Sequence, residues 1–508
     1  MKKEMLKIAK AFLKKHKAYP TMTDLISLGI KRTTMRDQFG NLDGLHDALY
    51  EECKELIFDL NREKSPDFNR KDFKRYIITT ATTGDVVDKQ ALKSLRSYCK
   101  KMDAKLLIHV ARGSGKLGQT LDPSLRGEYI CLNNLGLNSN VKLISVFQSG
   151  AKVDPTSGGV SRVGKRDSTI ILASPKQRLL YTATGIHSLP HAGMGTGSIT
   201  YPNYESSKLS GYVADHDHVM GAVVVEIQND SMFHFRQVQF DEAGRFVDLG
   251  LFFDGKTVSK MAPSAMVLGD WHSGKTCPMV KKASFAITKA LGIKEWVLHD
   301  AYDSTSNNHH EMGKLLLLSK KASKQELDLT KELTGLAKDL EDMVKVVNVT
   351  VVKSNHDEFL DRYLDSGAWI KHPYNTELCL ELASAVMNGF NPVEYAVTKF
   401  ASKDITKVTW LERDESYKIA GIECGSHGDK GPNGSRGSIV SIERSYDKCV
   451  FGHSHTPGIL RGAWQVGTST LPYPDYGTGP SSWMNTHCLI YPNGQRQLIN
   501  FLEGSWTI

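Results

Sequence analysis

The chain has 508 residues, of which 40% are hydrophobic and 24% are charged, and its formal net charge at pH 7 is +8. This composition excludes an intrinsically disordered chain, and the length is sufficient for roughly two or three domains with their own cores. No apolar run approaches the roughly 20 residues of a membrane-spanning helix, and the lysine-rich first residues lack the features of a secretory signal. The eight cysteines form no C-x-x-C pair, which predicts free thiols rather than a cysteine-ligated zinc. We therefore expect a protein of the cytoplasm that has no membrane partner.

Positive charge is concentrated at the beginning of the chain. The first 36 residues hold eight lysines and two arginines against two acidic residues, a local excess equal to the whole net charge. The segments TMTDLISLG and KRTTMRDQFG, which follow a lysine-rich amphipathic stretch, predict a helix-turn-helix domain over residues 1–60. The second helix of that motif enters the major groove of DNA, where it would present Arg32 and Arg36. A small helical domain used for assembly is the alternative interpretation.

A polar stretch broken by Pro66 follows and predicts a linker over residues 61–75. From that point short apolar strands accompany an amphipathic helix at Asp88–Lys101. This alternation predicts an α/β accessory domain over residues 76–254, with a core of its own.

Two clusters in the accessory domain could be taken for functional sites. They are the glycine-rich GMGTGS at residues 193–198 and the sequence DHDH at residues 215–218. Glycines serve turns as readily as ligands, and neighbouring side chains on a strand point to opposite faces, so one metal ion would not collect all four. We therefore favour a structural role for both clusters.

The stretch VLGDWHSGKT at residues 267–276 fits two different chemistries. Its last eight residues match the G-x-x-x-x-G-K-[ST] pattern of a loop that binds nucleotide phosphates, and EWVLHD at residues 295–300 supplies the later aspartate that such a site needs. Alternatively, Asp270 and His272 form a D-x-H pair at the end of an apolar strand, which is typical of a metal site. The segments that follow decide between these interpretations.

Further polar segments stand directly after apolar strands in the rest of the chain. They are HDAYD at 299–303, SNHDE at 354–358, CGSHG at 424–428 and FGHSH at 451–455. Loops at the carboxyl ends of neighbouring strands converge, so these side chains can surround one small volume. Asp, Asn and His are suitable ligands for two divalent ions about 3.5–4 Å apart that share one carboxylate, and Asp300 is the natural bridge. The series favours a two-metal centre in a domain over residues 255–508, and it makes the match to a phosphate-binding loop coincidental.

The ordered set D-x-H, D-x-x-D, N-H-D, H and G-H-x-H resembles the calcineurin-like metallophosphoesterase superfamily. The resemblance covers about half of the chain and implies a mixed β-sandwich flanked by helices, so the fold expected for the whole chain is α/β. It implies a first ion held by Asp270, His272, Asp300 and His455, and a second held by Asp300, Asn355, His427 and His453. The Asn and Asp oxygens favour two Mn²⁺ or Mg²⁺ ions, although this ligand set also accepts zinc or iron.

The same resemblance assigns roles to the residues beside these ligands. It implies that His356 lies next to the scissile phosphate and is oriented by Asp357, while Asp303 supports the ligands from behind. Water activated between the two ions would attack phosphorus, and His356 would protonate the leaving oxygen. One departure is His299, which stands where the superfamily usually has glycine.

Three more side chains are candidates for substrate contacts. His309 and His310 follow the bridging aspartate closely and suit either a phosphate contact or a helix cap. Arg436 lies in the glycine-rich loop GPNGSRGS after His427 and suits either a phosphate contact or a plain turn. The stretch at residues 311–345 has a long helical periodicity, which predicts a helical insertion that clamps substrate or mediates homo-oligomer formation.

A basic helix-turn-helix candidate ahead of a phosphoesterase domain favours DNA as the substrate. The layout of the whole chain resembles phage-encoded DNases, including the early host-DNA-degrading DNases of T5-like phages, and so the DNA-nuclease branch of the superfamily. The expected function is a metal-dependent DNase, a hydrolase of DNA phosphodiester bonds that acts in the host cytoplasm. The alternatives are a protein or small-molecule phosphatase or phosphodiesterase, and a DNA-binding regulatory protein whose phosphoesterase domain is inactive.

Overall fold

The computed structural model describes residues 1–16, 20–59, 69–113, 121–145, 149–157, 168–185, 188–471 and 479–508. The chain divides into a first unit of residues 1–180 and 191–260, together with residue 508, and a second unit of residues 181–190 and 261–507. Of the predicted linker over residues 61–75, residues 61–68 lie outside the described residues. Within the described ranges no helix is long and apolar enough to cross a membrane.

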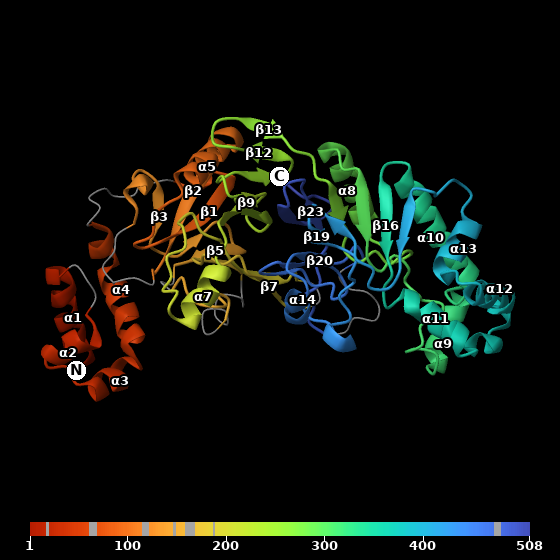
Figure 1. Ribbon diagram of the computed structural model, residues 1–508, viewed down its shortest axis with the longest axis horizontal. Helices are drawn as coiled ribbons and strands as arrows, with labels where there is room; N and C mark the ends of the chain where they lie inside the picture. Colours follow the sequence, from red (N-terminus) through yellow and green to blue (C-terminus); the bar gives the residue numbers. More distant parts are fainter. Residues whose placement is uncertain are drawn as a thin grey trace. The chain divides into compact units, whose positions relative to one another are not determined.

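The first unit begins with a group of helices. These are α1 (Lys2–His16), α2 (Met22–Ser27), α3 (Arg32–Phe39) and α4 (Leu42–Asp59), drawn in red in Figure 1. A reciprocal capping box between Thr21 and Asp24 begins α2, because each side chain accepts the backbone N–H of the other. Gly29, at a φ of +84°, makes the turn into α3. Helices α2 and α3 thus lie within the segment for which the sequence predicted a helix-turn-helix, and Arg32 and Arg36 are exposed on α3.

The α/β part of the first unit is built on a five-stranded sheet in the order β10-β9-β1-β2-β3. Its strands are β1 (Arg75–Thr82), β2 (Ala104–Ala111), β3 (Tyr129–Cys131), β9 (Gly221–Ile227) and β10 (Phe233–Gln239). β1, β2 and β3 run parallel, and β9 and β10 add an antiparallel edge. Helix α5 (Lys89–Met102) connects β1 to β2, and the Asp88 carboxylate caps its first turn.

The remaining elements of the first unit correct the placement of DHDH at residues 215–218 and locate GMGTGS at residues 193–198. The elements are β4 (Leu135–Gly136), β5 (Val141–Ile144), β6 (Thr169–Leu172), β8 (His191–Gly195), α7 (Leu209–His216), β11 (Phe246–Asp248), β12 (Leu251–Phe253) and β13 (Val258–Lys260). Strand β7 (Leu179–Thr182) begins in the first unit and ends in the second. The sequence DHDH ends a helix rather than lying on a strand. Half of GMGTGS lies in β8, where a Cβ on Gly195 would stand 2.0 Å from the carbonyl oxygen of Lys176. That glycine serves close packing rather than a turn.

The second unit is organised around a six-stranded sheet in the order β17-β16-β15-β14-β23-β24. Its strands are β14 (Ala265–Val267), β15 (Glu295–Leu298), β16 (Asn348–Val352), β17 (Val408–Leu411), β23 (Thr486–Ile490) and β24 (Arg496–Asn500). β14 to β17 are parallel neighbours, so their carboxyl ends share one edge of the sheet. The central strands β14, β15 and β16 are mostly apolar and almost wholly buried, as expected where both faces of a parallel sheet are covered.

Further strands and helices complete the second unit. The strands are β18 (Lys418–Ile419), β19 (Ile422–Glu423), β20 (Cys449–Phe451), β21 (Gly458–Leu460) and β22 (Ala463–Gln465). The helices are α8 (Pro278–Leu291), α9 (Leu315–Ser323), α10 (Leu329–Val344), α11 (Asp357–Asp365), α12 (Thr376–Met387), α13 (Pro392–Phe400) and α14 (Ile439–Ser445). The α/β class predicted for the chain is confirmed, with several mixed sheets.

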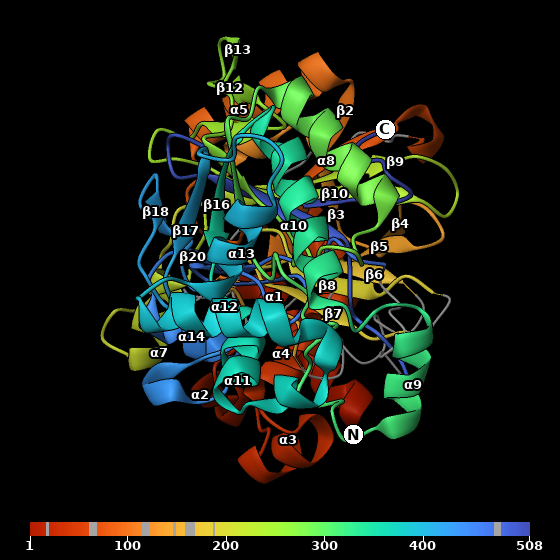
Figure 2. The same ribbon diagram turned by 90° about the vertical axis from the view of Figure 1, so that its right-hand side faces the viewer.

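Helix α10 lies within residues 311–345, for which the sequence predicted a helical insertion. It connects the parallel neighbours β15 and β16 and packs against β16 (Figure 2). Parallel strands need such a crossover helix, and α10 buries one apolar face, with Leu333, Leu336 and Leu340 fully inaccessible. Residues 311–345 thus hold the two helices α9 and α10, and α10 belongs to the core of the unit.

Candidate metal centre

The predicted metal ligands emerge where the parallel strands of the second unit end. Asp270 follows β14, Asp300 follows β15 and Asn355 follows β16. Backbone hydrogen bonds join the first two loops in register, because Trp271 N–H donates to the His299 carbonyl and His272 N–H donates to that of Asp300, at 3.0 and 2.7 Å. The loops are therefore fixed to each other before any metal is considered.

The backbone at this edge holds conformations that L-residues usually avoid. His272, Asp300, His453 and His455 have φ values of 47°, 45°, 76° and 59°. The left-handed region costs a non-glycine residue roughly 1–2 kcal/mol, so such residues persist where the surrounding structure fixes them. Four of them among the predicted ligands of the two sets indicate that the fold imposes side-chain directions here.

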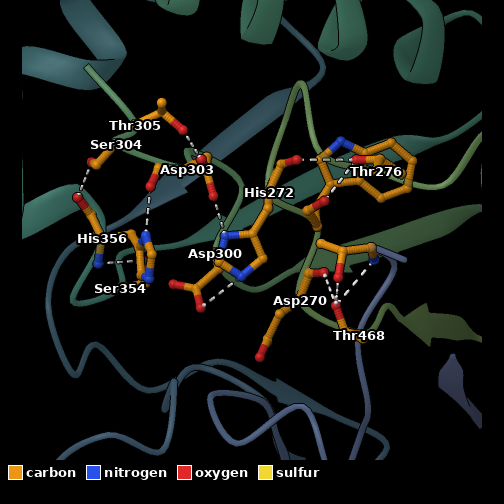
Figure 3. A network of polar contacts seen from close by, with 12 residues as sticks. Asp270, His272, Thr276, Asp300, Asp303, Ser304, Thr305, Ser354, His356 and Thr468 are labelled. Atoms are coloured by element: carbon orange, nitrogen blue, oxygen red, sulfur yellow. Dashed lines mark hydrogen bonds and ion pairs between the residues drawn. The ribbon is translucent and has the colours of Figure 1, made fainter. Parts of the chain in front are cut away.

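The first predicted ligand set is brought together in the core. One ligand atom from each of Asp270, His272, Asp300 and His455 lies within 4.8 Å of the others. His455 Nε2 is 3.2 Å from Asp270 Oδ2, and His272 Nε2 is 3.0 Å from His455 Nε2 and 3.5 Å from Asp300 Oδ2. All four side chains are buried, and Figure 3 shows Asp270, His272 and Asp300 converging from neighbouring loops.

Several buried carboxylate oxygens in this cluster lack the hydrogen-bond donors that buried polar atoms usually have. Both carboxylate oxygens of Asp270 and Oδ1 of Asp300 have no hydrogen bond of ordinary geometry within the described residues. An uncompensated buried carboxylate is costly, and a cation is the group that compensates it. His272 donates its Nδ1–H to Asp303 at 2.9 Å, so in the neutral ring Nε2 presents a lone pair toward His455. The donor set therefore fits a divalent ion.

The charges of the cluster are strongly coupled. Burial and the neighbouring Asp300 raise the pKa of Asp270 to about 7. Burial opposes ionisation of Asp300 as well, but the nearby His427 holds the pKa of that carboxyl well below its usual range. Metal ligands must be deprotonated, so protons and a metal ion compete for these atoms. Acidic conditions should therefore weaken metal binding.

The second predicted ligand set gathers around His427. Its Nε2 lies 3.3 Å from Asp300 Oδ1 and 3.1 Å from Asn355 Oδ1. The ring of His453 stands edge-on to that of His427 at a centroid distance of 5.3 Å. Asp300 thus touches both sets, which is the position expected of a bridging carboxylate.

The structure corrects one role and supports another. Asp303 accepts from His272 Nδ1, as a supporting residue should. His356 is oriented by the backbone carbonyl of Asp303, 2.6 Å from its Nδ1, and not by Asp357 (Figure 3). Asp357 begins α11, and its Oδ2 turns back to accept from the amide and hydroxyl of Ser354 at 2.7 and 2.9 Å. Its carboxylate shapes the turn that carries Asn355 and His356.

The histidine that replaces the expected glycine is accommodated by a glycine elsewhere. His299 is fully buried, and its ring lies 5.6 Å from that of His427. Opposite it, a Cβ on Gly452 would stand 2.1 Å from Asp270 Oδ1 and 3.0 Å from the Cβ of His299. Gly452 is the glycine of the G-H-x-H motif, and its place directly before the H-x-H pair was a usable signal for this role, which was not predicted.

The alternative phosphate-loop interpretation of residues 267–276 is not supported by the contacts. Thr276 donates its hydroxyl to the Trp271 carbonyl at 2.6 Å, and the Lys275 amide donates to the His272 carbonyl at 2.8 Å. The Lys275 side chain is exposed. These donors are used within the loop, which closes a turn behind His272 instead of opening a phosphate cradle.

The three residues predicted to contact substrate, His309, His310 and Arg436, lie in two different loops of the second unit. His309 and His310 are exposed and stand edge-on to the ring of Phe359 at 4.6 and 5.7 Å, and that ring stacks on His356 at 5.0 Å. The structure therefore links the histidine pair to His356 through Phe359, which the sequence analysis missed. Arg436 is exposed in the loop that follows His427.

Comparison with known proteins gives one relative to report. The chain is 31% identical to "Protein A1" of Escherichia phage T5 over 471 residues, which are 86% of this chain and 83% of the phage protein. No model of a known protein family matches the chain. The similarity to the phage protein therefore extends over both units.

We predict that Gly452→Ala weakens metal binding. The new methyl group would displace the Asp270 carboxylate, so we expect about a 10–100-fold loss of Mn²⁺ affinity in titration calorimetry, the usual effect of disturbing a ligand's support. Gly335→Ala is the matched control, because a Cβ there meets nothing within 4 Å on α10. Equal Mn²⁺ affinities in the two variants would contradict the close approach of Gly452 to Asp270.

Proposed function

The chain belongs to the family of Protein A1 of Escherichia phage T5, and from this premise we propose that it is a metal-dependent DNase. The observation that carries the proposal is the buried cluster of Asp270, His272, Asp300 and His455. Within the described residues, both carboxylate oxygens of Asp270 and Oδ1 of Asp300 accept no hydrogen bond of ordinary geometry. The order of its motifs places the second unit, in our proposal, in the calcineurin-like metallophosphoesterase superfamily. The reaction is the hydrolysis of a phosphodiester bond.

The residues that would hold two Mn²⁺ or Mg²⁺ ions fall into two sets that share Asp300. Asp270, His272 and His455 complete the first set, and Asn355, His427 and His453 complete the second. Such ions supply positive charge to the phosphoryl oxygens and make water more acidic. Burial of the ligands keeps bulk water from screening these charges.

His356 is suited to move the proton to the leaving oxygen. Its Nδ1–H donates to the Asp303 carbonyl, so the proton that it transfers is carried on Nε2. Its ring lies edge-on to that of His272 at 4.8 Å, beside the metal centre. Burial lowers the pKa of His356, which favours release of the proton once it has been acquired.

DNA is the substrate that the rest of the chain favours. The first unit begins with a helix-turn-helix segment whose exposed Arg32 and Arg36 could meet phosphates or base edges. The positive charge concentrated in this segment suits a polyanion. Together with the phage relative, these features favour a DNase that degrades host DNA in the host cytoplasm over a protein or small-molecule phosphatase.

The first test is hydrolysis itself. Purified protein is incubated with plasmid, linear duplex DNA and bis(p-nitrophenyl) phosphate, each with Mn²⁺, Mg²⁺ or EDTA, and the products are sized. We expect metal-dependent cleavage of DNA, abolished together with bound Mn²⁺ in Asp270→Ala and Asp300→Ala, because both remove proposed ligands. Lys275→Ala, as the control, should keep most activity.

Two results would contradict this account. DNA binding without hydrolysis in either metal would favour a regulatory protein with an inactive phosphoesterase domain. An ATP-dependent activity that disappears in Lys275→Ala would restore the phosphate-loop interpretation.

A second prediction separates proton transfer from metal binding. His356→Asn should retain bound Mn²⁺ and DNA affinity but lose roughly 10²–10⁴-fold in cleavage rate, the usual contribution of a general acid. Because p-nitrophenolate leaves without protonation, the loss should be smaller for bis(p-nitrophenyl) phosphate than for DNA. Equal losses on the two substrates would assign His356 to charge stabilisation, and loss of Mn²⁺ would assign it to the ligands.

A third prediction concerns the basic segment. The double variant Arg32→Ala, Arg36→Ala should bind duplex DNA more weakly in EDTA, and the slope of log affinity against log salt should fall by about 0.9 for each lost phosphate contact. Lys100→Ala, Lys101→Ala removes the same charge from exposed positions at the end of α5 and should leave the slope unchanged. An unchanged slope in the arginine variant would assign the segment to assembly.

A further inference from the structure

Helix α10 places two carboxylates beside the loops that carry the proposed metal ligands. Glu332 and Asp339 are seven residues apart, which is close to two helical turns, so they lie on the same side of α10. The adjoining face, with Leu333, Leu336 and Leu340, is anchored in the core. The two carboxylates are therefore held by a rigid element.

Asp339 holds the side chains on both sides of His272. Its Oδ2 accepts from the indole Nε1–H of Trp271 at 3.1 Å and from the hydroxyl of Ser273 at 2.8 Å. These two donors flank the ligand that has the unusual φ of 47°. Its other oxygen, Oδ1, pairs with the ammonium group of Lys281 at 2.6 Å. One carboxylate oxygen thus holds both neighbours of His272.

Glu332 fixes the second loop. It accepts the backbone N–H groups of Thr305 and Ser306 at 2.7 and 3.0 Å, one on each oxygen. The hydroxyl of Thr305 in turn donates to Asp303, whose other oxygen accepts from His272 Nδ1 (Figure 3). A continuous path of hydrogen bonds therefore runs from α10 to the ring of His272.

We infer that Asp339 and Glu332 are positioning residues of the metal centre, which set the direction of His272 from opposite sides without touching the metal themselves. The inference rests on the proposed function, because it assumes that His272 is a ligand. Residues that orient metal ligands commonly contribute about 10–100-fold to metal affinity. The sequence signal was an Asp and a Glu spaced by seven beside an apolar helical face, which solvent-exposed helices show as well.

The experiment measures Mn²⁺ binding to the full chain by titration calorimetry. Asp339→Ala should weaken binding by about 10–100-fold. Asp339→Asn should stay close to the wild type, because the amide oxygen can still accept from Trp271 and Ser273 and only the contact with Lys281 is lost. Lys281→Met, the matched control, removes that ion pair and a longer one to Asp342 at 3.8 Å. It keeps the contacts of Asp339 with Trp271 and Ser273, so it should leave the affinity unchanged.

Two further variants keep the test decisive if Asp339→Ala does not fold. Ser273→Ala removes one of the two donors and should weaken Mn²⁺ binding in the same direction by a smaller factor. Glu332→Gln keeps one acceptor oxygen of two and should give an intermediate loss. In each variant, the increase in Tm caused by Mn²⁺ should become smaller as the Mn²⁺ affinity falls. If the substituted residue had a purely structural role, Tm would instead fall equally with and without Mn²⁺.

The possible outcomes separate this inference from the proposed function. A wild-type chain that binds no Mn²⁺ would contradict both. Wild-type Mn²⁺ affinity in folded Asp339→Ala, Ser273→Ala and Glu332→Gln would overturn the positioning role alone. Equal losses in Asp339→Asn and Asp339→Ala would also overturn it, because they would assign the effect to charge rather than to the contacts with Trp271 and Ser273.

Discussion

The second unit depends on one electrostatic constraint, which is that Asp270 and Asp300 are buried side by side without enough donors to satisfy them. Two carboxylates in such surroundings repel each other and have lost their water, so they require cations close at hand. His427 and His272 supply part of that charge, and their imidazoles are themselves held at fixed distances by Asn355 and Asp303. The site is an arrangement that a metal ion would complete.

This constraint explains features that stability alone would disfavour. The left-handed backbone at His272 and His455 and the buried His299 each cost free energy. Those at His272 and His299 persist because the parallel strands β14, β15 and β16 bring their carboxyl ends to one edge, and the loops there are joined by backbone hydrogen bonds. Gly452 is needed for the same arrangement, because a side chain at this position would collide with Asp270 and His299.

Much of the site could be predicted because strand order converts distant motifs into neighbours. Asp270, His272, Asp300 and His455 were expected to meet, and the structure brings them together. The orientation of His356 could not be predicted, because it depends on a carbonyl of the Asp303 loop and not on the adjacent Asp357. The cluster DHDH was placed on a strand although it ends α7, because short polar runs carry no periodicity that distinguishes the two.

The sequence by itself determined the identity and chain order of the candidate metal ligands, the concentration of basic charge in the first 36 residues and the α/β class, because these follow from residue type and local periodicity. Only the tertiary structure decided that α10 is a crossover helix of the core, that it directs Asp339 and Glu332 toward the ligand loops, and that Gly452 makes room for Asp270. Such contacts join positions far apart in the chain. They depend on how the crossover helix and the strands pack, so no local sequence pattern predicts them.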